Sequence, residues 1–489
     1  MHDIVIRDAT LYDGSGAPPV RADVAIDGDR IAAVGAAPGG ARRTLEARGL
    51  ALAPGFIDVH THDDFAALMH PDMAFKLAGG VTSCVVGNCG FGAAPHAAAA
   101  VMAKTLHPKI ALPEWRGYAG YVRRLEERPP GVNIGVLVGH GTARLAAMGT
   151  EPRAPTGAEM AAMKDIVVEG LEAGALGLSS GLVYDPGRFA ATGELAELCA
   201  LMRGTGALYA THMRDEGAAL LESVREAIEI GRRAGVPVQI SHHKASGRTA
   251  WGRVRESLKL IEAAQAEGLS VHADQYPYTA GSTILSAVYR DGRLRGVVGD
   301  LTGEDVVIAS TESHPEWEGR SLAQLGAQMG CSAEQAAERV LAGDRGVTCV
   351  LHAMCEEDVR TVMRHPSTMI GSDGIPTIEG KPHPRLYGTF ARVLGRYARE
   401  EKLFPMEEAV WRMTGFAAQK FGLRGRGLVR AGLAADLVLF DPATIIDRGT
   451  FEDPKRAPEG IRAVFVNGAQ AIEDGRPTGV RTGRVLRRN

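Results

Sequence analysis

Two histidines separated by one residue stand directly after a short apolar run. The run Gly55-Phe56-Ile57-Asp58-Val59 leads into His60-Thr61-His62. Residues i and i+2 of a β-strand point to the same side, so His60 and His62 can direct two imidazoles at one point. Imidazole is a common ligand of Zn²⁺, and the pair could therefore provide half of a metal site. Such short pairs also arise by chance, so the elements around them decide whether they matter.

The middle of the chain contains the elements that could position these histidines. Apolar stretches typical of strands alternate with amphipathic stretches typical of helices, such as Glu159–Ala173 and Ala219–Ala234. Eight strand-then-helix units predict an α/β fold, a (β/α)8 TIM barrel with a parallel sheet. The expected strands are Gly55–His60, Val81–Asn88, Ile134–Val138, Ala175–Ser179, Leu208–Thr211, Val236–Ser241, Ser270–Asp274 and Met369–Ser372.

The length of 489 residues predicts more than one structural unit. Residues 1–53 and 421–489 are rich in short strands and turns, and we expect both ends to pack together as one small β-sandwich. Residues 54–420 would form the catalytic barrel. Within it, residues 285–346 are too many for a single crossover, so they are predicted to be an inserted subdomain and a candidate lid, with Val347–Leu351 as a further strand.

Composition and charge exclude several classes of protein. The chain has 55 basic and 58 acidic residues, which argues against a nucleic-acid or membrane-surface partner. Its six cysteines are irregularly spaced, so no disulfide framework is expected and a reducing compartment is favoured. No signal peptide or membrane-spanning run is found in the sequence. We therefore expect a cytoplasmic protein that acts on a small molecule; the sequence does not indicate its oligomeric state.

Potential metal ligands follow five of the expected strands. In (β/α)8 barrels, catalytic groups gather at the C-terminal ends of the strands, so these side chains should meet. Thiolate, imidazole and carboxylate together suit a Zn²⁺-like ion, which lowers the pKa of its bound water to about 7. Asp373 could take the proton from that water and pass it to a leaving nitrogen. The residues are His60, His62, Cys89, His212, His242 and Asp373.

This set of motifs resembles the amidohydrolase superfamily and, within it, the N-acyl-D-amino-acid deacylases (D-aminoacylases). The stretch from Gly55 to Asp64 is shared in part with the whole superfamily. Hydantoinase-like relatives commonly bridge two metals with a carboxylated lysine on strand four, whereas residues 175–182 contain no lysine. The motifs similar to the deacylases are Gly87-Asn88-Cys89-Gly90, Thr211-His212-Met213-Arg214-Asp215-Glu216, Ser241-His242-His243-Lys244 and His383-Pro384-Arg385-Leu386-Tyr387-Gly388-Thr389-Phe390.

The resemblance implies a zinc-dependent hydrolysis of N-acyl-D-amino acids to a carboxylate and a free D-amino acid. It implies that Cys89, His212 and His242 hold one tightly bound zinc ion. His60 and His62 would complete a second, weaker position with Asp373, the general base and acid. His242 is preferred to His243 because the family motif reads Ser-His-x-Lys and because adjacent strand residues face opposite ways. The implied substrate-binding residues are Lys244, Tyr276, Ser282 and Arg385.

Two other functions stay open at this point. One is a cyclic amidase of the hydantoinase or dihydropyrimidinase type, and the other is a non-catalytic scaffold with the same fold. The preferred side chain is also open, since apolar D-residues, D-Glu and D-Asp all fit the motifs. His140 and His352 are expected to be structural or, at most, to line the pocket. Asp215 and Glu216 are expected to form local ion pairs, with Arg214 as a candidate partner.

Overall fold

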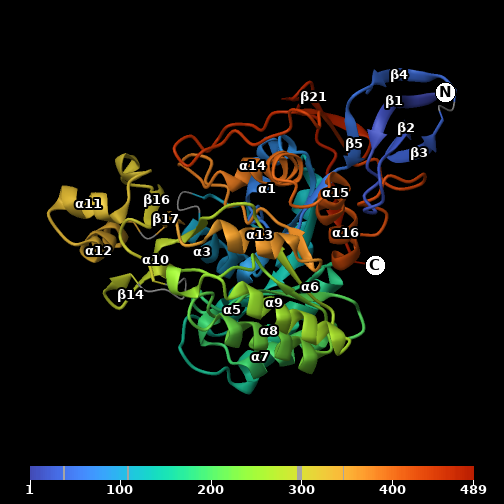
Figure 1. Ribbon diagram of the computed structural model, residues 1–489. Helices are drawn as coiled ribbons and strands as arrows, with labels where there is room; N and C mark the ends of the chain where they lie inside the picture. The colour runs from blue at the N-terminus through green and yellow to red at the C-terminus, as the bar shows by residue number, and fades with distance from the viewer. Residues whose placement is uncertain (37–38, 107–109, 295–299, 345, 489) are drawn as a thin grey trace.

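Eight parallel strands form the central barrel of the computed structural model, which describes residues 1–36, 39–106, 110–294, 300–344 and 346–488 (Figure 1). The strands lie side by side in chain order, and the first and last meet at a parallel bridge between Thr61 and Gly374. The predicted (β/α)8 barrel is confirmed. The strands are β6 (Phe56–Asp58), β7 (Val81–Val86), β8 (Asn133–Gly139), β9 (Gly177–Gly181), β10 (Leu208–His212), β11 (Val238–Ile240), β12 (Val271–Gln275) and β18 (Thr368–Ile370).

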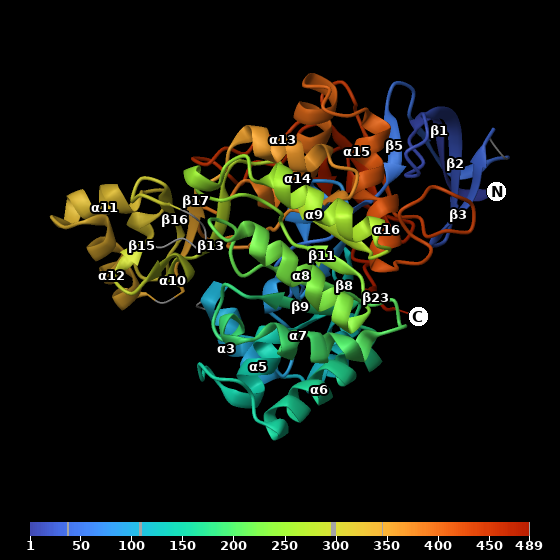
Figure 2. The same ribbon diagram turned by 60° about the horizontal axis from the view of Figure 1, so that its bottom comes forward.

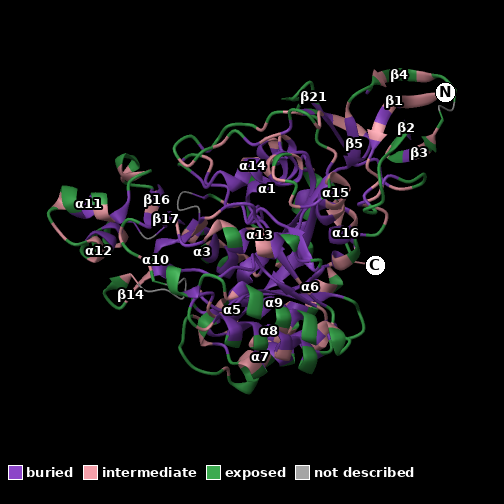
Figure 3. Ribbon diagram, in the orientation of Figure 1, coloured by how far each residue is buried: buried purple, intermediate pink, exposed green. Residues whose placement is uncertain are grey.

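The barrel strands and the helices around them follow from two different patterns. Both faces of the strands are buried, and β8 (Asn133–Gly139) is accordingly almost continuously apolar. The helices bury one face only: α8 (Leu220–Ala234) packs Leu220, Val224 and Ile228 inward and ends at Gly235, whose left-handed φ of 70° suits glycine. Figure 2 shows α7, α8 and α9 on the outside of the barrel, and Figure 3 shows their exposed outer faces.

The remaining helices are short and mostly surround the barrel. None among the described residues is long and apolar enough to cross a membrane. They are α1 (Ala66–Met69), α2 (Ala74–Leu77), α3 (His96–Leu106), α4 (Gly117–Glu127), α5 (His140–Met148), α6 (Gly157–Glu172), α7 (Thr192–Cys199), α9 (Val254–Ala266), α13 (Glu356–Arg364), α14 (Arg385–Arg392), α15 (Met406–Met413) and α16 (Gly415–Phe421).

Both ends of the chain contribute to a second sheet beside the barrel. Its nine strands are hydrogen-bonded in one continuous sheet, in which β5 of the N-terminal part pairs antiparallel with β19 of the C-terminal part. Val24, Leu437 and Phe465 belong to its separate apolar core. The strands are β1 (His2–Leu11), β2 (Val20–Asp27), β3 (Arg30–Gly35), β4 (Ala41–Glu46), β5 (Ala51–Pro54), β19 (Leu437–Phe440), β20 (Ile461–Val466), β21 (Ala469–Glu473) and β22 (Arg476–Pro477), while β23 (Val485–Leu486) pairs with β8.

The segment between β12 and β18 has a core of its own and projects from one side of the barrel (Figure 1). A three-stranded antiparallel sheet packs there against two helices. Residues 295–299 and 345 of the predicted insertion lie outside the described residues. The limits of this segment and of the end domain, and the lid role, stay predictions. Its elements are β13 (Gly281–Ile284), α10 (Leu285–Val288), β14 (Tyr289–Arg290), β15 (Arg293–Leu294), β16 (Val306–Ser310), α11 (Leu322–Met329), α12 (Ala333–Gly343) and β17 (Thr348–Leu351).

Candidate metal centre and active site

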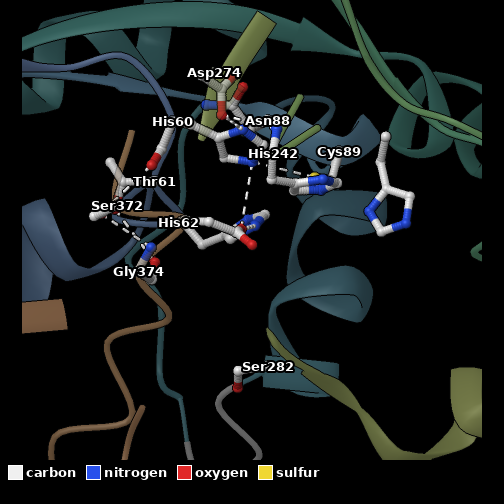
Figure 4. A network of polar contacts seen from close by, with 12 residues as sticks. His60, Thr61, His62, Asn88, Cys89, His242, Asp274, Ser282, Ser372 and Gly374 are labelled. Atoms are coloured by element: carbon white, nitrogen blue, oxygen red, sulfur yellow. Dashed lines mark hydrogen bonds and ion pairs between the residues drawn. The ribbon is translucent and has the colours of Figure 1, made fainter. Parts of the chain in front are cut away.

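The six expected donor residues lie together where β6, β7, β10, β11 and β18 end. Figure 4 labels four of them, His60, His62, Cys89 and His242. Their ligand atoms form two groups, in each of which all atoms lie within 4.8 Å of one another. The first group, which we call the thiolate group, is Cys89, His212 and His242. The second, which we call the carboxylate group, is His60, His62, Cys89 and Asp373.

The donors approach one another closely inside the protein. Cys89 Sγ lies 3.4 Å from His60 Nε2 and 3.6 Å from His242 Nε2. Asp373 Oδ1 lies 3.2 Å from His62 Nε2 and 3.4 Å from His60 Nε2. All of these residues are buried. Such a convergence of sulfur, imidazole and carboxylate is typical of a site for a Zn²⁺-like ion.

Three of the donor residues have a left-handed backbone, which side chains other than glycine seldom adopt. The φ angles are 54° at Cys89, 36° at His242 and 49° at Asp373. Each such residue costs about 1–3 kcal/mol unless its surroundings enforce it, and such residues cluster at active sites. At His242 the turn follows the end of β11, and the next residue, His243, leaves the site and contacts Ser257 Oγ at 2.8 Å.

Two buried carboxylates orient the imidazoles. Asp274 Oδ1 lies 3.1 Å from His60 Nδ1 and accepts a hydrogen bond from the His242 backbone N–H at 2.8 Å. Glu216 Oε1 lies 3.0 Å from His242 Nδ1 and accepts a hydrogen bond from Lys244 Nζ at 2.7 Å. At His60, a carboxylate at Nδ1 favours the tautomer that leaves Nε2 free for a metal ion. His242 Nδ1 also contacts Lys244 Nζ at 2.9 Å.

Neither carboxylate is identified as part of the site by the sequence. Asp274 is the last residue of an expected strand, and this position alone could have indicated that it belongs to the site. Glu216 was expected to form a local ion pair, with Arg214 as a candidate partner; its partner is Lys244, and Arg214 Nη2 contacts Glu226 Oε1 at 2.9 Å. Nothing in the sequence links Glu216 to Lys244, since the two residues lie on different loops.

The charges around the thiolate group favour a metal-binding state. Burial alone would raise the pKa of Cys89, but His60, His212 and His242 bring it well below its ordinary value. Burial lowers the pKa of His212, which keeps that ring neutral. Neither ring nitrogen of His212 has a hydrogen-bond partner among the described residues, although the ring is buried. A thiolate beside an unpartnered neutral imidazole fits a zinc-type cation.

The carboxylate group differs from the thiolate group in its charges, because it combines an ionised carboxylate with a histidine whose pKa is raised. Burial alone would raise the pKa of Asp373, but Arg385, His242 and His60 bring it well below its ordinary value. Burial alone would lower the pKa of His62, but Asp373 and Cys89 raise it to about 9. In this state Asp373 forms one buried ion pair with the imidazole of His60 and another with that of His62.

The expected substrate-binding residues lie beside Asp373. Arg385 Nη2 contacts Asp373 Oδ2 at 2.9 Å and donates to the Ser282 carbonyl oxygen at 3.2 Å. Its Nε and Nη1 atoms are buried without a partner in the described chain, and its guanidinium lies 4.5 Å from the ring centroid of Tyr276. Each of these two nitrogens can donate a hydrogen bond to an oxygen acceptor such as a carboxylate.

A cavity opens next to these residues. Lys244, Tyr276, Ser282 and Asp373 form one side of it. Its other lining residues include the apolar Val183, Val288, Leu351 and Met354, together with polar residues such as His212, Glu216 and His242. Tyr184 also lines the cavity, packing its ring edge-on to His212 with a centroid distance of 5.0 Å, and sequence reasoning missed it. The cavity can therefore hold a small molecule that has one charged end and one apolar end.

The other two histidines near strand ends lie outside both donor groups. His140 Nε2 lies 2.9 Å from Glu194 Oε1, and Arg144 contacts the same carboxylate. His352 packs edge-on to Phe451. Both contacts agree with the expected structural role of these histidines.

Known proteins similar to this chain include acylase enzymes over its full length. A D-aminoacylase of Alcaligenes xylosoxydans xylosoxydans is 44% identical, with 99% of this chain and 98% of the relative covered. The crystal structure of a D-aminoacylase matches with a TM-score of 0.91 at 41% identity, covering 100% of both chains. An N-acyl-D-glutamate deacylase from Bordetella bronchiseptica, solved with zinc and a phosphonate mimic of the tetrahedral intermediate, matches with a TM-score of 0.89 at 39% identity, covering 99% of both.

More distant structures share the fold alone. A D-hydantoinase matches with a TM-score of 0.60 at 16% identity, covering 99% of both chains. The model of the Amidohydrolase family matches residues 43–472, which is most of the sequence. The resemblance drawn from the motifs is thus confirmed, and the chain belongs to the amidohydrolase family.

Proposed function

We propose that this protein is a zinc-dependent hydrolase that cleaves N-acyl-D-amino acids into a carboxylate and a free D-amino acid. The observation that carries the proposal is the position of Arg385, whose Nη2 contacts Asp373 at the edge of the donor cluster and whose Nε and Nη1 have no partner in the described part of the chain. This arrangement suits a substrate whose α-carboxylate lies next to its scissile amide. The names of the relatives agree with this chemistry.

Cys89, His212 and His242 would hold the essential zinc ion, while His60 and His62 with Asp373 would form a second, weaker position. When bound, the ion lowers the pKa of its water to about 7 and polarises the substrate carbonyl. The donor set fits this ion, because it offers a thiolate and the unpartnered nitrogens of His212.

Asp373 would act as the general base and then as the general acid. Its low pKa keeps it ionised, so it can accept a proton from the attacking water and deliver it to the leaving nitrogen. The Asp373 carboxylate also contacts Arg385. Arg385 would therefore bind both the substrate carboxylate and the residue that accepts the proton. This contact would hold the amide in line with Asp373.

Arg385 and Tyr276 would bind the α-carboxylate, with Lys244 and Ser282 beside them. Tyr276 Oη now contacts Met354 Sδ at 3.4 Å, a weak bond that a carboxylate can replace. With the carboxylate and amide fixed, only one configuration at Cα directs the side chain into the apolar part of the cavity. We expect this pocket to prefer an apolar D-side chain over D-Glu or D-Asp, because Val183, Val288, Leu351 and Met354 offer no charge to pair.

Chiral analysis of the products formed from racemic N-acetyl-methionine tests the proposal. The zinc-loaded enzyme should release D-methionine and leave the L-substrate intact. Release of L-methionine alone, or no hydrolysis at all, would contradict it. A panel of N-acetyl derivatives of D-Leu, D-Met, D-Glu and D-Asp then tests the pocket, and a higher kcat/KM for the acidic substrates would contradict the apolar assignment.

The two alternative functions have weaker support. A cyclic amidase of the hydantoinase type usually needs a strand-four lysine, and β9 (Gly177–Gly181) has none. Assays with hydantoin and dihydropyrimidine substrates distinguish it. A non-catalytic scaffold should have lost donor residues, whereas all six are present here. Elemental analysis showing no transition metal after zinc-rich expression would favour that scaffold.

A further inference from the structure

Lys76 is a buried lysine that lies close to the donor cluster but is not one of its members. It belongs to α2, and its side chain is only 1% exposed. Its ammonium donates hydrogen bonds to Asp58 Oδ2 at 2.7 Å, Thr61 Oγ1 at 2.8 Å and Ser372 Oγ at 3.1 Å, and it pairs with Asp63 Oδ2 at 3.1 Å. Lysines are rarely buried so fully, so this network calls for an explanation.

The partners of Lys76 lie next to donor residues on two strands. Asp58 ends β6 two residues before His60, and Thr61 directly follows His60. Ser372 directly precedes Asp373 after β18. Asp58 also accepts hydrogen bonds from both the backbone N–H and the hydroxyl of Ser372. One ammonium therefore links the chain segments that carry the two histidines and the carboxylate of the carboxylate group.

These segments form the seam at which the barrel closes. In the described part of the chain, β6 and β18 share no ladder of strand pairs and are joined by the Thr61–Gly374 bridge. Two backbone bonds flank the site: Asp373 N–H donates to the His60 carbonyl at 2.7 Å, and His62 N–H donates to the Gly374 carbonyl at 2.9 Å. A ladder this short sets the strand register weakly on its own.

The seam is also very closely packed. A Cβ atom added to Gly371 would lie only 2.7 Å from His60 Cβ, so a glycine is needed there. Burial alone would lower the pKa of Lys76, but the charges of Asp58 and Asp63 raise it above its ordinary value, and the lysine stays charged. Removing that charge would leave two buried carboxylates without compensation, and they would separate.

We propose that Lys76 is a positioning residue that clamps the barrel seam and so fixes the distance between the His60-x-His62 pair and Asp373. The inference rests on the proposed function, since it assigns Lys76 to the geometry of that reaction. It predicts that Lys76 affects the chemical step and the carboxylate group more than it affects substrate binding.

The experiment compares Lys76→Met with a matched variant, Arg412→Met. Arg412 is also about 1% exposed, and it donates to the Thr368 carbonyl at 2.7 Å, at the start of β18. Arg412 therefore holds the N-terminal end of β18, whereas Lys76 contacts Ser372 just beyond its C-terminal end. Each holoenzyme is measured for kcat and KM with N-acetyl-D-methionine, for thermal midpoint, and, after exchange of the metal, for the absorption spectrum of bound Co²⁺.

Lys76→Met should lower kcat by about 10–100-fold, the usual effect of residues that orient metal ligands, and change KM by less than about threefold. Its Co²⁺ spectrum should differ from that of the parent. Arg412→Met should lower the thermal midpoint while its kcat stays within about twofold of the parent and its spectrum is unchanged. A parental kcat and spectrum in Lys76→Met, or an equal loss of kcat in Arg412→Met, would overturn the proposal.

Ser372→Ala covers the case in which Lys76→Met does not fold. It removes one acceptor of the clamp and keeps the charges, so kcat should fall by about 3–10-fold with the fold intact; an unchanged kcat would overturn the proposal. The Co²⁺ spectrum does not depend on the substrate. If the parent hydrolyses no N-acyl-D-amino acid, the proposed function fails, and an altered or unaltered spectrum still decides the role of Lys76.

Discussion

The thiolate group and the carboxylate group share Cys89 but differ in what their other members contact. His212 in the thiolate group has no hydrogen-bond partner among the described residues, whereas His62 in the carboxylate group is already paired with Asp373 at 3.2 Å. An ion that enters the thiolate group breaks no described hydrogen bond at His212, whose Nε2 lies 3.8 Å from Glu216 Oε2. An ion that enters the carboxylate group must replace the buried pair between His62 and Asp373. The difference explains in physical terms why the first position should bind metal more tightly.

Cys89→Ser is the strongest test of this comparison, because it removes the donor that both groups share. We expect loss of bound zinc and a fall in kcat/KM of about 10⁴-fold, equivalent to about 5.5 kcal/mol of lost charge stabilisation. Zinc content by mass spectrometry and steady-state kinetics measure the two effects. Full zinc content with parental activity would show that the thiolate group is not the working position.

Asp373→Ala separates the chemical role of the carboxylate group from metal retention. Loss of a general acid and base costs about 10²–10⁴-fold in rate, so kcat should fall by that amount. About one equivalent of zinc should stay bound, because the thiolate group is intact. Loss of all zinc from this variant would mean that Asp373 holds the essential ion.

Glu216→Gln weakens the support behind the thiolate group without removing a donor. Glu216 contacts His242 Nδ1 at 3.0 Å and Lys244 Nζ at 2.7 Å, and the neutral amide loses both ion pairs. We expect kcat/KM to fall by about 10–100-fold and zinc affinity to fall by a similar factor. Competition with a chelator measures the affinity. Asp215→Asn is the control, since Asp215 contacts the backbone N–H groups of Gly217 and Ala219 and neither donor group.

His62→Ala should have the smallest effect, because it affects only the weaker position. We expect less than about tenfold loss of kcat/KM and an undiminished first equivalent of zinc. A zinc titration followed by calorimetry should lose its weaker step and keep its tighter one. Loss of the tight step instead would reverse the assignment of the two groups.

The sequence predicts the donor set well, because each member stands at a strand end that its own local pattern identifies. Gly87-Asn88-Cys89-Gly90 and Ile240-Ser241-His242 are readable within a few residues, and a parallel barrel then brings strand ends together. The strand limits are less accurate: β11 ends at Ile240, so His242 lies in a left-handed turn and not in the strand. His242 therefore faces the site because of that turn, which strand alternation does not describe.

The supporting network could not be predicted, because its contacts are non-local. Lys76 lies on a four-residue helix and contacts Ser372, which is far away in the sequence. Asp274 reaches His60 from a strand on the far side of the seam, next to β18 in the sheet. Neither periodicity nor spacing contains these pairings, and only the closed barrel creates them. The pairing of Glu216 with Lys244 in place of the candidate Arg214 is non-local in the same way.

The sharing of Cys89 between two groups has a consequence for the durability of the enzyme. Its low pKa makes it a thiolate, which is the form of cysteine that peroxide oxidises. A single oxygen atom added to this sulfur would disable both positions at once, and none of the five other donors could replace it. A bound cation occupies the sulfur and shields it. The metal-free protein should therefore lose activity quickly in air, and the metal-bound protein slowly. A bound ion would thus protect the enzyme from oxidation as well as activate it.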